Sequence, residues 1–179
     1  MTTASTILSL SGGGTAGWMS AAALRRILHR DCKIHLIESE EIGTVGGGEA
    51  TVPLIRAFNK LLEIDEADFV KHTQGTFKLG IQFNDWGRRR DSYIHGFGTL
   101  GHDLSGIAFH QYWRRAKDVG KANELGAYSL NTLAASLGRF MVSAADAPKD
   151  NPLADIAYAY HFDAGLYAQI YGVTPRQEV

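Results

Sequence analysis

Three glycines near the start of the chain have the spacing of a turn that binds a pyrophosphate. Gly12, Gly14 and Gly17 follow the pattern G-x-G-x-x-G. In such turns the first glycine allows a sharp bend, the second lets a phosphate approach because it has no Cβ, and the third lets a helix pack close to a strand. The free N–H groups and the positive dipole end of the following helix favour an anion. The spacing therefore predicts a dinucleotide-binding turn.

The segments around these glycines predict the unit that carries such a turn. An apolar strand over Ile7 to Leu10 precedes it, and the helix that follows has most of its apolar residues on one face: Met19, Ala22, Ala23, Leu24, Ile27 and Leu28. A second strand ends in Glu38, about twenty residues beyond Gly17, where such folds place a carboxylate that binds a ribose hydroxyl. We expect an α/β fold with a Rossmann-like βαβ core. The alternative is a glycine-rich turn that binds nothing.

The bulk composition is that of an ordinary globular domain. The chain has 179 residues, of which 45% are hydrophobic and 21% charged, and its formal net charge is -1. This charge does not favour nucleic acid or an anionic membrane as a partner. The sequence has no apolar run long enough to span a bilayer and no signal-peptide pattern, so we expect a cytoplasmic protein. Cys32 is the only cysteine, which excludes an internal disulfide and a cysteine-rich metal site.

A second glycine-rich loop extends from Gly43 to Pro53 and leads into a helix that begins near Leu54. Thr51 is a good N-cap residue, and proline is tolerated in the first helical turn. This loop therefore offers a second helix N-terminus. Such a loop is commonly an ordinary connection, but two of them so close in sequence favour a ligand between them.

Alternation of apolar and polar residues predicts a strand from Thr76 to Phe83, in which Lys78 lies on the face opposite the apolar one. Most lysines in strands are solvated. The alternative is that Lys78 faces a cavity that Gly80 leaves open. The sequence pattern does not decide between the two.

The segment from Tyr93 to Gly101 mixes aromatic residues with glycines. This composition suits a loop that presents His95 and Phe97 to an aromatic ligand, and it suits a packed turn equally well. Further along, the pattern predicts helices over residues 104–117 and 130–141, a short strand over residues 156–162, and a helix capped by Asp163.

Taken together, these segments resemble one family, the flavin-dependent tryptophan halogenases. The resemblance covers nearly the whole chain, in the family's order, and is carried by five segments: Gly12 to Met19, Gly46 to Pro53, Gly75 to Gly80, His95 to Gly98 and Tyr160 to Ala164. The first two, G-G-G-T-A-G-W-M and G-G-G-E-A-T-V-P, are far more specific than a generic flavin motif.

The resemblance implies an FAD-dependent halogenase of tryptophan or another indole. In that family reduced FAD and O2 oxidise chloride or bromide to hypohalous acid, which reaches a lysine through a tunnel, and the lysine delivers the halogen to an aromatic ring. The implied partners are an indole, a halide, O2 and a separate flavin reductase that supplies the reduced cofactor.

The resemblance also assigns residues to these roles. Lys78 matches the lysine at the end of the tunnel, and His95 and Phe97 match residues that sandwich the substrate ring. The implied FAD-binding residues are Gly12, Gly14, Thr15, Ala16, Gly17 and Glu38 for the adenosine and pyrophosphate part, with Ala50 and Thr51 near the flavin.

Family members are longer than this chain, so we expect residues 1–179 to form a single FAD-binding domain, the N-terminal part of a larger fold with an incomplete substrate region. Two alternatives remain. One is a truncated FAD-binding module without catalytic activity. The other is a flavin monooxygenase of another kind, which shares the glycine turn but does not require Lys78.

Overall fold

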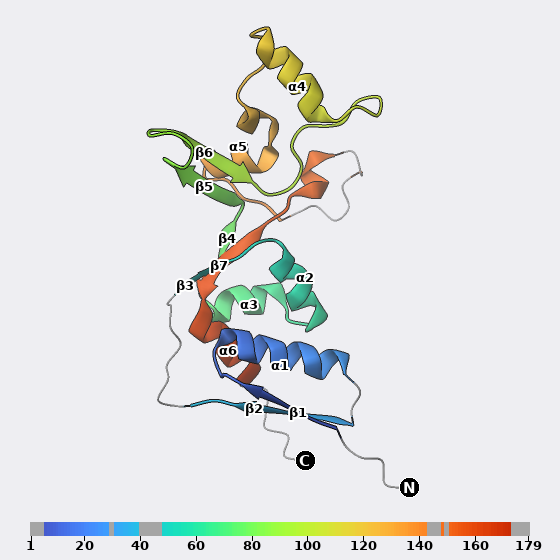
Figure 1. The fold of residues 1–179 in the computed structure, drawn as a ribbon, viewed down its shortest axis with the longest axis vertical. Helices are drawn as coiled ribbons and strands as arrows, with labels where there is room; N and C mark the ends of the chain where they lie inside the picture. Colours follow the sequence, from blue (N-terminus) through green and yellow to red (C-terminus); the bar gives the residue numbers. More distant parts are fainter. Residues whose placement is uncertain (1–5, 29–30, 40–47, 143–147, 149–150, 173–179) are drawn as a thin grey trace. The chain divides into compact units, whose positions relative to one another are not determined.

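The computed structural model describes residues 6–28, 31–39, 48–142, 148 and 151–172, and in these residues the fold is α/β (Figure 1). The chain divides into two compact units. Unit 1 comprises residues 1–76 and 160–179, and unit 2 comprises residues 77–159. The assignment of residues 1–179 to a single FAD-binding domain stays a prediction.

Unit 1 contains the predicted βαβ core. Strand β1 (Thr6–Ser11) and strand β2 (Cys32–Ile37) are parallel, with Thr6 opposite Cys32 and Ser11 opposite Ile37. Helix α1 (Thr15–Ile27) connects them and lies along one face of the pair (Figure 1). Leucine and isoleucine side chains at alternate strand positions are half-buried on that face, as the period of two requires: Leu8, Leu10, Ile34 and Leu36.

Shorter elements complete unit 1. Their order along the chain is β3 (Gly48–Ala50), α2 (Leu54–Leu61), α3 (Glu66–His72), β4 (Thr76–Lys78), β7 (Ala159–Asp163) and α6 (Ala164–Gly172). The strand order in their sheet is β3-β7-β4, and the chain leaves unit 1 within β4 and returns within β7. The predicted cap at Asp163 is confirmed, because its carboxylate accepts the Leu166 N–H. The Asp65 carboxylate caps α3 in the same way by accepting the Asp68 N–H.

Aromatic rings form the core of unit 1. Phe69 of α3 is fully buried, and its ring centroid lies 4.8 Å from that of Tyr160 and 5.3 Å from those of Phe162 and Tyr167. The Tyr167 hydroxyl donates to Oδ1 of buried Asn59 at 2.6 Å, and burial raises the pKa of Tyr167 to about 12. The buried hydroxyl is therefore satisfied, as a polar group in a core must be.

Unit 2 is built around a hairpin and short helices. Its elements are β5 (Gly80–Asn84), β6 (Ser92–Gly96), α4 (Phe109–Asp118), the 3-10 helices η1 (Leu125–Tyr128) and η2 (Pro152–Asp155), and α5 (Leu130–Ser136). Strands β5 and β6 are antiparallel, with Gly80 opposite Gly96. Phe77 stacks on Phe140 at 4.0 Å between ring centroids, and buried Tyr158 contacts both rings at their edges.

Three predicted elements differ from the structure in their bounds. The strand expected over residues 76–83 is interrupted at Leu79. The helix expected from residue 104 begins at Phe109, because a bridge between Leu104 and Ile107 closes a turn first. The helix expected over residues 130–141 ends at Ser136, shortly before Gly138, whose positive φ of 60° terminates helices readily.

Three further expectations are wrong or shifted. Thr51 does not cap α2, because its hydroxyl instead bonds with the backbone of Tyr160 in β7. The strand expected over residues 156–162 spans Ala159–Asp163. In the second glycine loop, residues 40–47 lie outside the described residues, and residues 48–50 form β3 rather than a loop.

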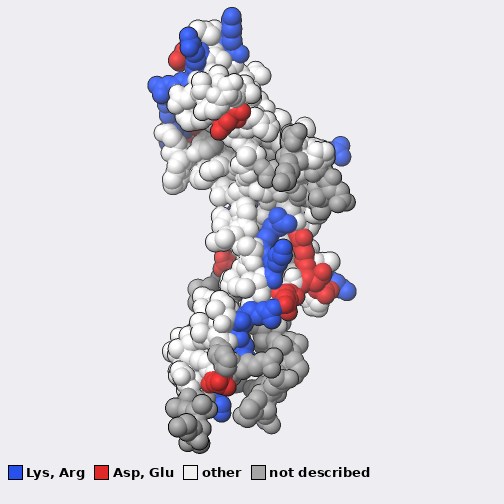
Figure 2. All heavy atoms as spheres, turned by 90° about the vertical axis from the view of Figure 1, so that its right-hand side faces the viewer, with Lys and Arg blue, Asp and Glu red and all other residues white. Residues whose placement is uncertain are grey.

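Charged side chains of both signs are interspersed over unit 1. Figure 2 shows red and blue side chains next to each other there, and Arg26 and Glu63 form an ion pair. Among the described residues, no helix has the length and apolarity that crossing a membrane requires.

The buried aromatic cluster predicts which residue unit 1 depends on. Phe69→Ala should destabilise unit 1 by about 3–5 kcal/mol, because it leaves a cavity between three other rings. Urea titration followed by near-ultraviolet circular dichroism would measure this. Leu54→Ala is the matched control, since Leu54 is 75% exposed and its truncation should change stability by less than about 0.5 kcal/mol. Equal losses in the two variants would contradict the assigned core.

Candidate functional site

The first glycine turn has the geometry that its three spaced glycines predict. Gly12 has φ of 125°, which L side chains rarely adopt. A Cβ on Gly17 would lie 1.7 Å from the Gly12 carbonyl oxygen, so only glycine lets α1 pack this closely on the turn. A Cβ on Gly14 would meet no described atom within 4 Å, so the space in front of Gly14 is open.

The start of α1 is available to an anion. Gly14 precedes the helix with extended backbone angles, and no side chain in the described part of the chain caps the first turn. The N–H groups of that turn therefore keep their donor capacity for a ligand. Thr15 lies at the same end, where its hydroxyl donates to the Ala164 carbonyl at 3.2 Å, and Ala16 is exposed beside it.

Glu38 lies against the glycine turn. It follows β2 directly, and a Cβ on Gly13 would lie 2.0 Å from Glu38 Oε2. The Trp18 indole N–H donates to the same Oε2 atom at 3.2 Å. Gly13 and Trp18 thus orient the carboxylate predicted to bind ribose. The sequence analysis did not predict this role for either residue. The triple glycine and the tryptophan directly after Gly17 are the signals that could have indicated it.

The second predicted flavin contact lies on β3 and just after it. Ala50 is exposed, and Thr51 is fixed by three hydrogen bonds with the Tyr160 backbone: its N–H and its hydroxyl donate to the carbonyl oxygen, and its Oγ1 accepts the Tyr160 N–H. Thr51 is therefore held rigidly. Its role towards a flavin, like that of Ala50, stays a prediction.

Lys78 is buried, with 8% of its surface exposed. The alternative that this lysine is solvated, as most lysines in strands are, is therefore wrong. Burial lowers the pKa of its amine from the ordinary value of 10.5, which favours the neutral form. Its Nζ atom lies 5.6 Å from the centroid of the Phe97 ring, within the range of a cation–π contact. The structure thus brings two of the predicted site residues together.

Gly80 does not leave a cavity beside Lys78, contrary to one of the two expectations. A Cβ at this position would lie 2.5 Å from the His95 carbonyl oxygen and 2.9 Å from the Gly96 Cα. The backbone of β6 occupies the space where a side chain at position 80 would lie. Gly80 therefore allows two strands to approach closely rather than opening space for a substrate.

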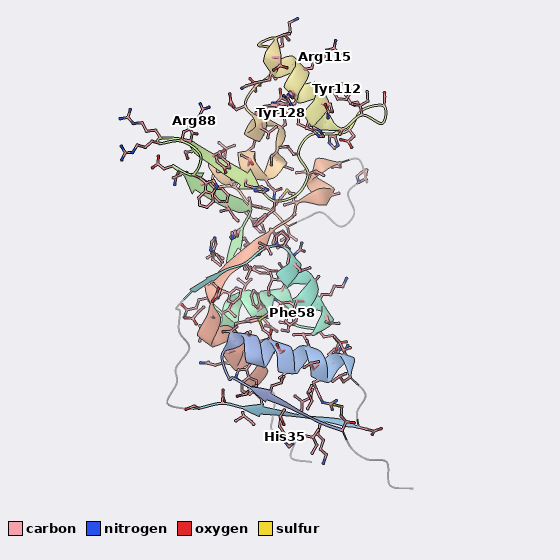
Figure 3. The ribbon with its side chains drawn as sticks, in the orientation of Figure 1. His35, Phe58, Arg88, Tyr112, Arg115 and Tyr128 are labelled. Carbon is pink, nitrogen blue, oxygen red and sulfur yellow. The ribbon has the colours of Figure 1, made fainter. Side chains whose placement is uncertain are left out.

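His95 and Phe97 lie at the end of β6 rather than in the expected loop. His95 pairs with Ile81 across the hairpin and is exposed, whereas Phe97 follows the strand and is half-buried. The Phe97 N–H donates to the Leu79 carbonyl at 2.8 Å. Their contact with a substrate ring stays a prediction. Figure 3 shows Arg88 at the far tip of the same hairpin, pointing away from it.

Asn131 was not predicted from the sequence, although it lies directly beside this group. It is buried at the start of α5, and its amide nitrogen donates to the carbonyl oxygens of Leu79, at 3.3 Å, and Ala157. A pocket of about 240 Å³ borders its other neighbours Tyr128, Leu130 and Leu133. The only sequence signal was an asparagine near the start of an apolar helix.

The sequence profile of the tryptophan halogenase family matches residues 8–173. A flavin-dependent halogenase from Xanthomonas campestris, Xcc4156, is 46% identical with a TM-score of 0.83 over 93% of this chain. BrvH from Brevundimonas sp. BAL3, also described as a flavin-dependent halogenase, is 40% identical with a TM-score of 0.81 over 94%. Tryptophan 6-halogenase ThaL from Streptomyces albogriseolus is 31% identical over 88% of the chain. The chain spans only 32%, 33% and 32% of these three proteins.

The open space at Gly14 predicts a variant that folds but binds poorly. Gly14→Ala should keep the stability of the protein, because alanine accepts φ of -69° and the new Cβ meets no atom of the described residues within 4 Å. It should weaken FAD binding by about tenfold or more, because the Cβ occupies the space that a pyrophosphate would approach. Flavin fluorescence titration would measure the affinity. Unchanged affinity would remove Gly14 from the binding site.

Gly17→Ala is the companion variant and, unlike Gly14→Ala, should destabilise the protein. Its Cβ would collide with the Gly12 carbonyl, so we expect a loss of stability of about 1–3 kcal/mol. Thermal denaturation followed by circular dichroism would detect this loss. A Gly17→Ala protein as stable as the parent would show that the helix does not pack on the turn in this way.

The buried position of Lys78 predicts its titration. In lysine labelled with ¹³C, the Lys78 Cε resonance should titrate below pH 10.5, because desolvation disfavours the ammonium form. Lys78→Arg would assign the resonance. A midpoint at or above 10.5 would show that the amine is solvated or held by an acidic partner.

Proposed function

This chain belongs to the tryptophan halogenase family, and on that premise we propose that it provides the flavin-binding and halogen-transferring residues of a flavin-dependent halogenase that acts on tryptophan or another indole. The observation that carries the proposal is Lys78, whose buried amine lies over the Phe97 ring. Lysine is almost never fully buried unless it is paired, and ionisable groups perturbed by burial cluster at functional sites.

The glycine turn supports FAD as the cofactor. Its residues fit the group, because within the described residues no atom crowds a Cβ at Gly14 and no side chain caps the first turn of α1. Glu38, oriented by Trp18 and Gly13, would accept hydrogen bonds from the ribose. When bound in its reduced form, FAD would supply the electrons that activate O2 for the oxidation of chloride or bromide to hypohalous acid.

Lys78 would transfer the halogen. Its neutral amine, favoured by burial, can attack the halogen of hypohalous acid: an N–halogen bond forms, the O–halogen bond breaks, and water leaves. The halogen then passes to a ring carbon, the ring loses a proton, and the amine is restored. Alternatively the ammonium donates a hydrogen bond to hypohalous acid and directs it to the ring. Both routes need an amine shielded from water.

His95 and Phe97 would hold the substrate ring beside this amine. Phe97 offers an apolar ring face near Lys78, and exposed His95 is two residues away on the same strand end. Stacked aromatic rings contribute about 0.5–1.5 kcal/mol beyond the buried area. The proposed reaction further needs a halide, O2 and a flavin reductase that supplies reduced FAD.

The proposal predicts a product that depends on Lys78. The chain would be incubated with FAD, NADH, a flavin reductase, chloride and tryptophan, and chlorotryptophan would be measured by mass spectrometry. Lys78→Ala should lower product by about 100-fold or more while FAD binding is retained. Lys71→Ala is the matched control, because Lys71 is exposed on α3 and should leave the product unchanged.

The other outcomes separate the competing functions. FAD binding without any chlorinated product would support a flavin-binding module without catalytic activity. A hydroxylated product that survives Lys78→Ala would support a flavin monooxygenase. Failure to bind FAD would contradict all three.

A further inference from the structure

The backbone on each side of Lys78 is fixed, and two different devices fix it. On the N-terminal side Phe77 is packed by Phe140 and buried Tyr158. On the C-terminal side Leu79 lies at the break between β4 and β5, where its carbonyl oxygen is left outside the strand pairing. The direction of the Lys78 side chain therefore depends on what holds the Leu79 peptide.

Two donors hold that carbonyl oxygen. The Phe97 N–H donates to it at 2.8 Å and the Asn131 side-chain amide at 3.3 Å, and a carbonyl oxygen has two lone pairs to offer. The same Asn131 nitrogen donates to the Ala157 carbonyl, next to Tyr158. Because both partners can only accept, the nitrogen end of the amide must face them.

Asn131 therefore joins three segments by hydrogen bonds: the end of β4, the start of α5 and the residues that lead into β7. It is 4% exposed, so water does not replace it there. A buried amide whose nitrogen has two fixed acceptors has a single orientation, which makes it a suitable clamp.

We infer that Asn131 is a positioning residue that holds the Lys78 amine over the Phe97 ring, by fixing the Leu79 carbonyl to which the Phe97 backbone is also bound. Asn131 does not contact the reacting atoms. This role rests on the proposed function, in which Lys78 transfers the halogen. The effect of the Asn131 hydrogen bonds on Lys78 and Phe97 can nevertheless be measured without any turnover.

The test compares Asn131→Leu with Ser129→Ala in the full chain. Leucine keeps the volume of asparagine and removes both hydrogen bonds. Ser129→Ala removes the N-cap bond of α5, from the Thr132 N–H to Ser129 Oγ, and leaves both donors to the Leu79 carbonyl in place. Two readouts are needed: the ¹³C titration of the Lys78 amine, and hydrogen exchange of the Phe97 N–H relative to the other amides of the β5–β6 hairpin.

We expect the pKa of Lys78 to rise towards 10.5 in Asn131→Leu, because a loosened backbone admits water, and to stay lowered in Ser129→Ala. The Phe97 N–H should lose protection selectively in Asn131→Leu. A general loss of stability would expose all hairpin amides alike. If both variants leave the Lys78 titration and the Phe97 protection as in the parent, or change them equally, the inference is overturned.

If Asn131→Leu does not fold, Asn131→Ser replaces it, because serine is small and too short to reach both carbonyl oxygens; the same two readouts then decide. Neither readout depends on halogenation. If the chain forms no chlorotryptophan but Asn131→Leu shows the selective response, the proposed function is refuted and the role of Asn131 stands. If the chain forms chlorotryptophan but the selective response is missing, the proposed function stands and the role of Asn131 is refuted.

Discussion

Close approach of one backbone segment to another is the constraint on which both units depend. A single methyl group at Gly17 would collide with the Gly12 carbonyl, and one at Gly80 would collide with the His95 carbonyl. Gly96 and Gly101 are enclosed in the same way, by Ser129 and Thr132 and by the Phe109 ring. Glycine at positions 17 and 80 lets a helix meet a turn and two strands meet each other.

The βαβ core could be predicted from the sequence because its signals are local. Apolar periodicity gives β1, α1 and β2 within a few residues of their bounds, and the glycine spacing gives the turn between them. At two positions where prediction failed, a tertiary contact had overridden a local preference. Thr51 has the chemistry of a cap but bonds with Tyr160, which lies 109 residues away, and the strand through Lys78 breaks where Leu79 bonds with Phe97 and Asn131.

In the candidate site, too, the residues with a local signal could be predicted, and those that depend on tertiary contacts could not. A dinucleotide-binding turn requires glycines and an acidic residue at a fixed spacing, so the sequence alone could identify Gly12, Gly14, Gly17 and Glu38. It could not decide whether Lys78 is solvated, because alternation in a strand gives the face of a side chain but not what covers that face. It also missed Gly13 and Trp18, because the triple glycine and the tryptophan after Gly17 do not by themselves name Glu38 as their partner. It missed Asn131 because no short pattern encodes its contact with Leu79.

The aromatic cluster of unit 1 has a consequence for the synthesis of the chain. Phe69 packs on Tyr160, Phe162 and Tyr167, which leave the ribosome only after all of unit 2 has been made. Unit 2 is continuous in sequence and has its own partners at hand as it emerges. Helix α3 must instead wait, with the Phe69 ring uncovered, until β7 and α6 have been made, so in this unit an apolar ring stays exposed longer during translation.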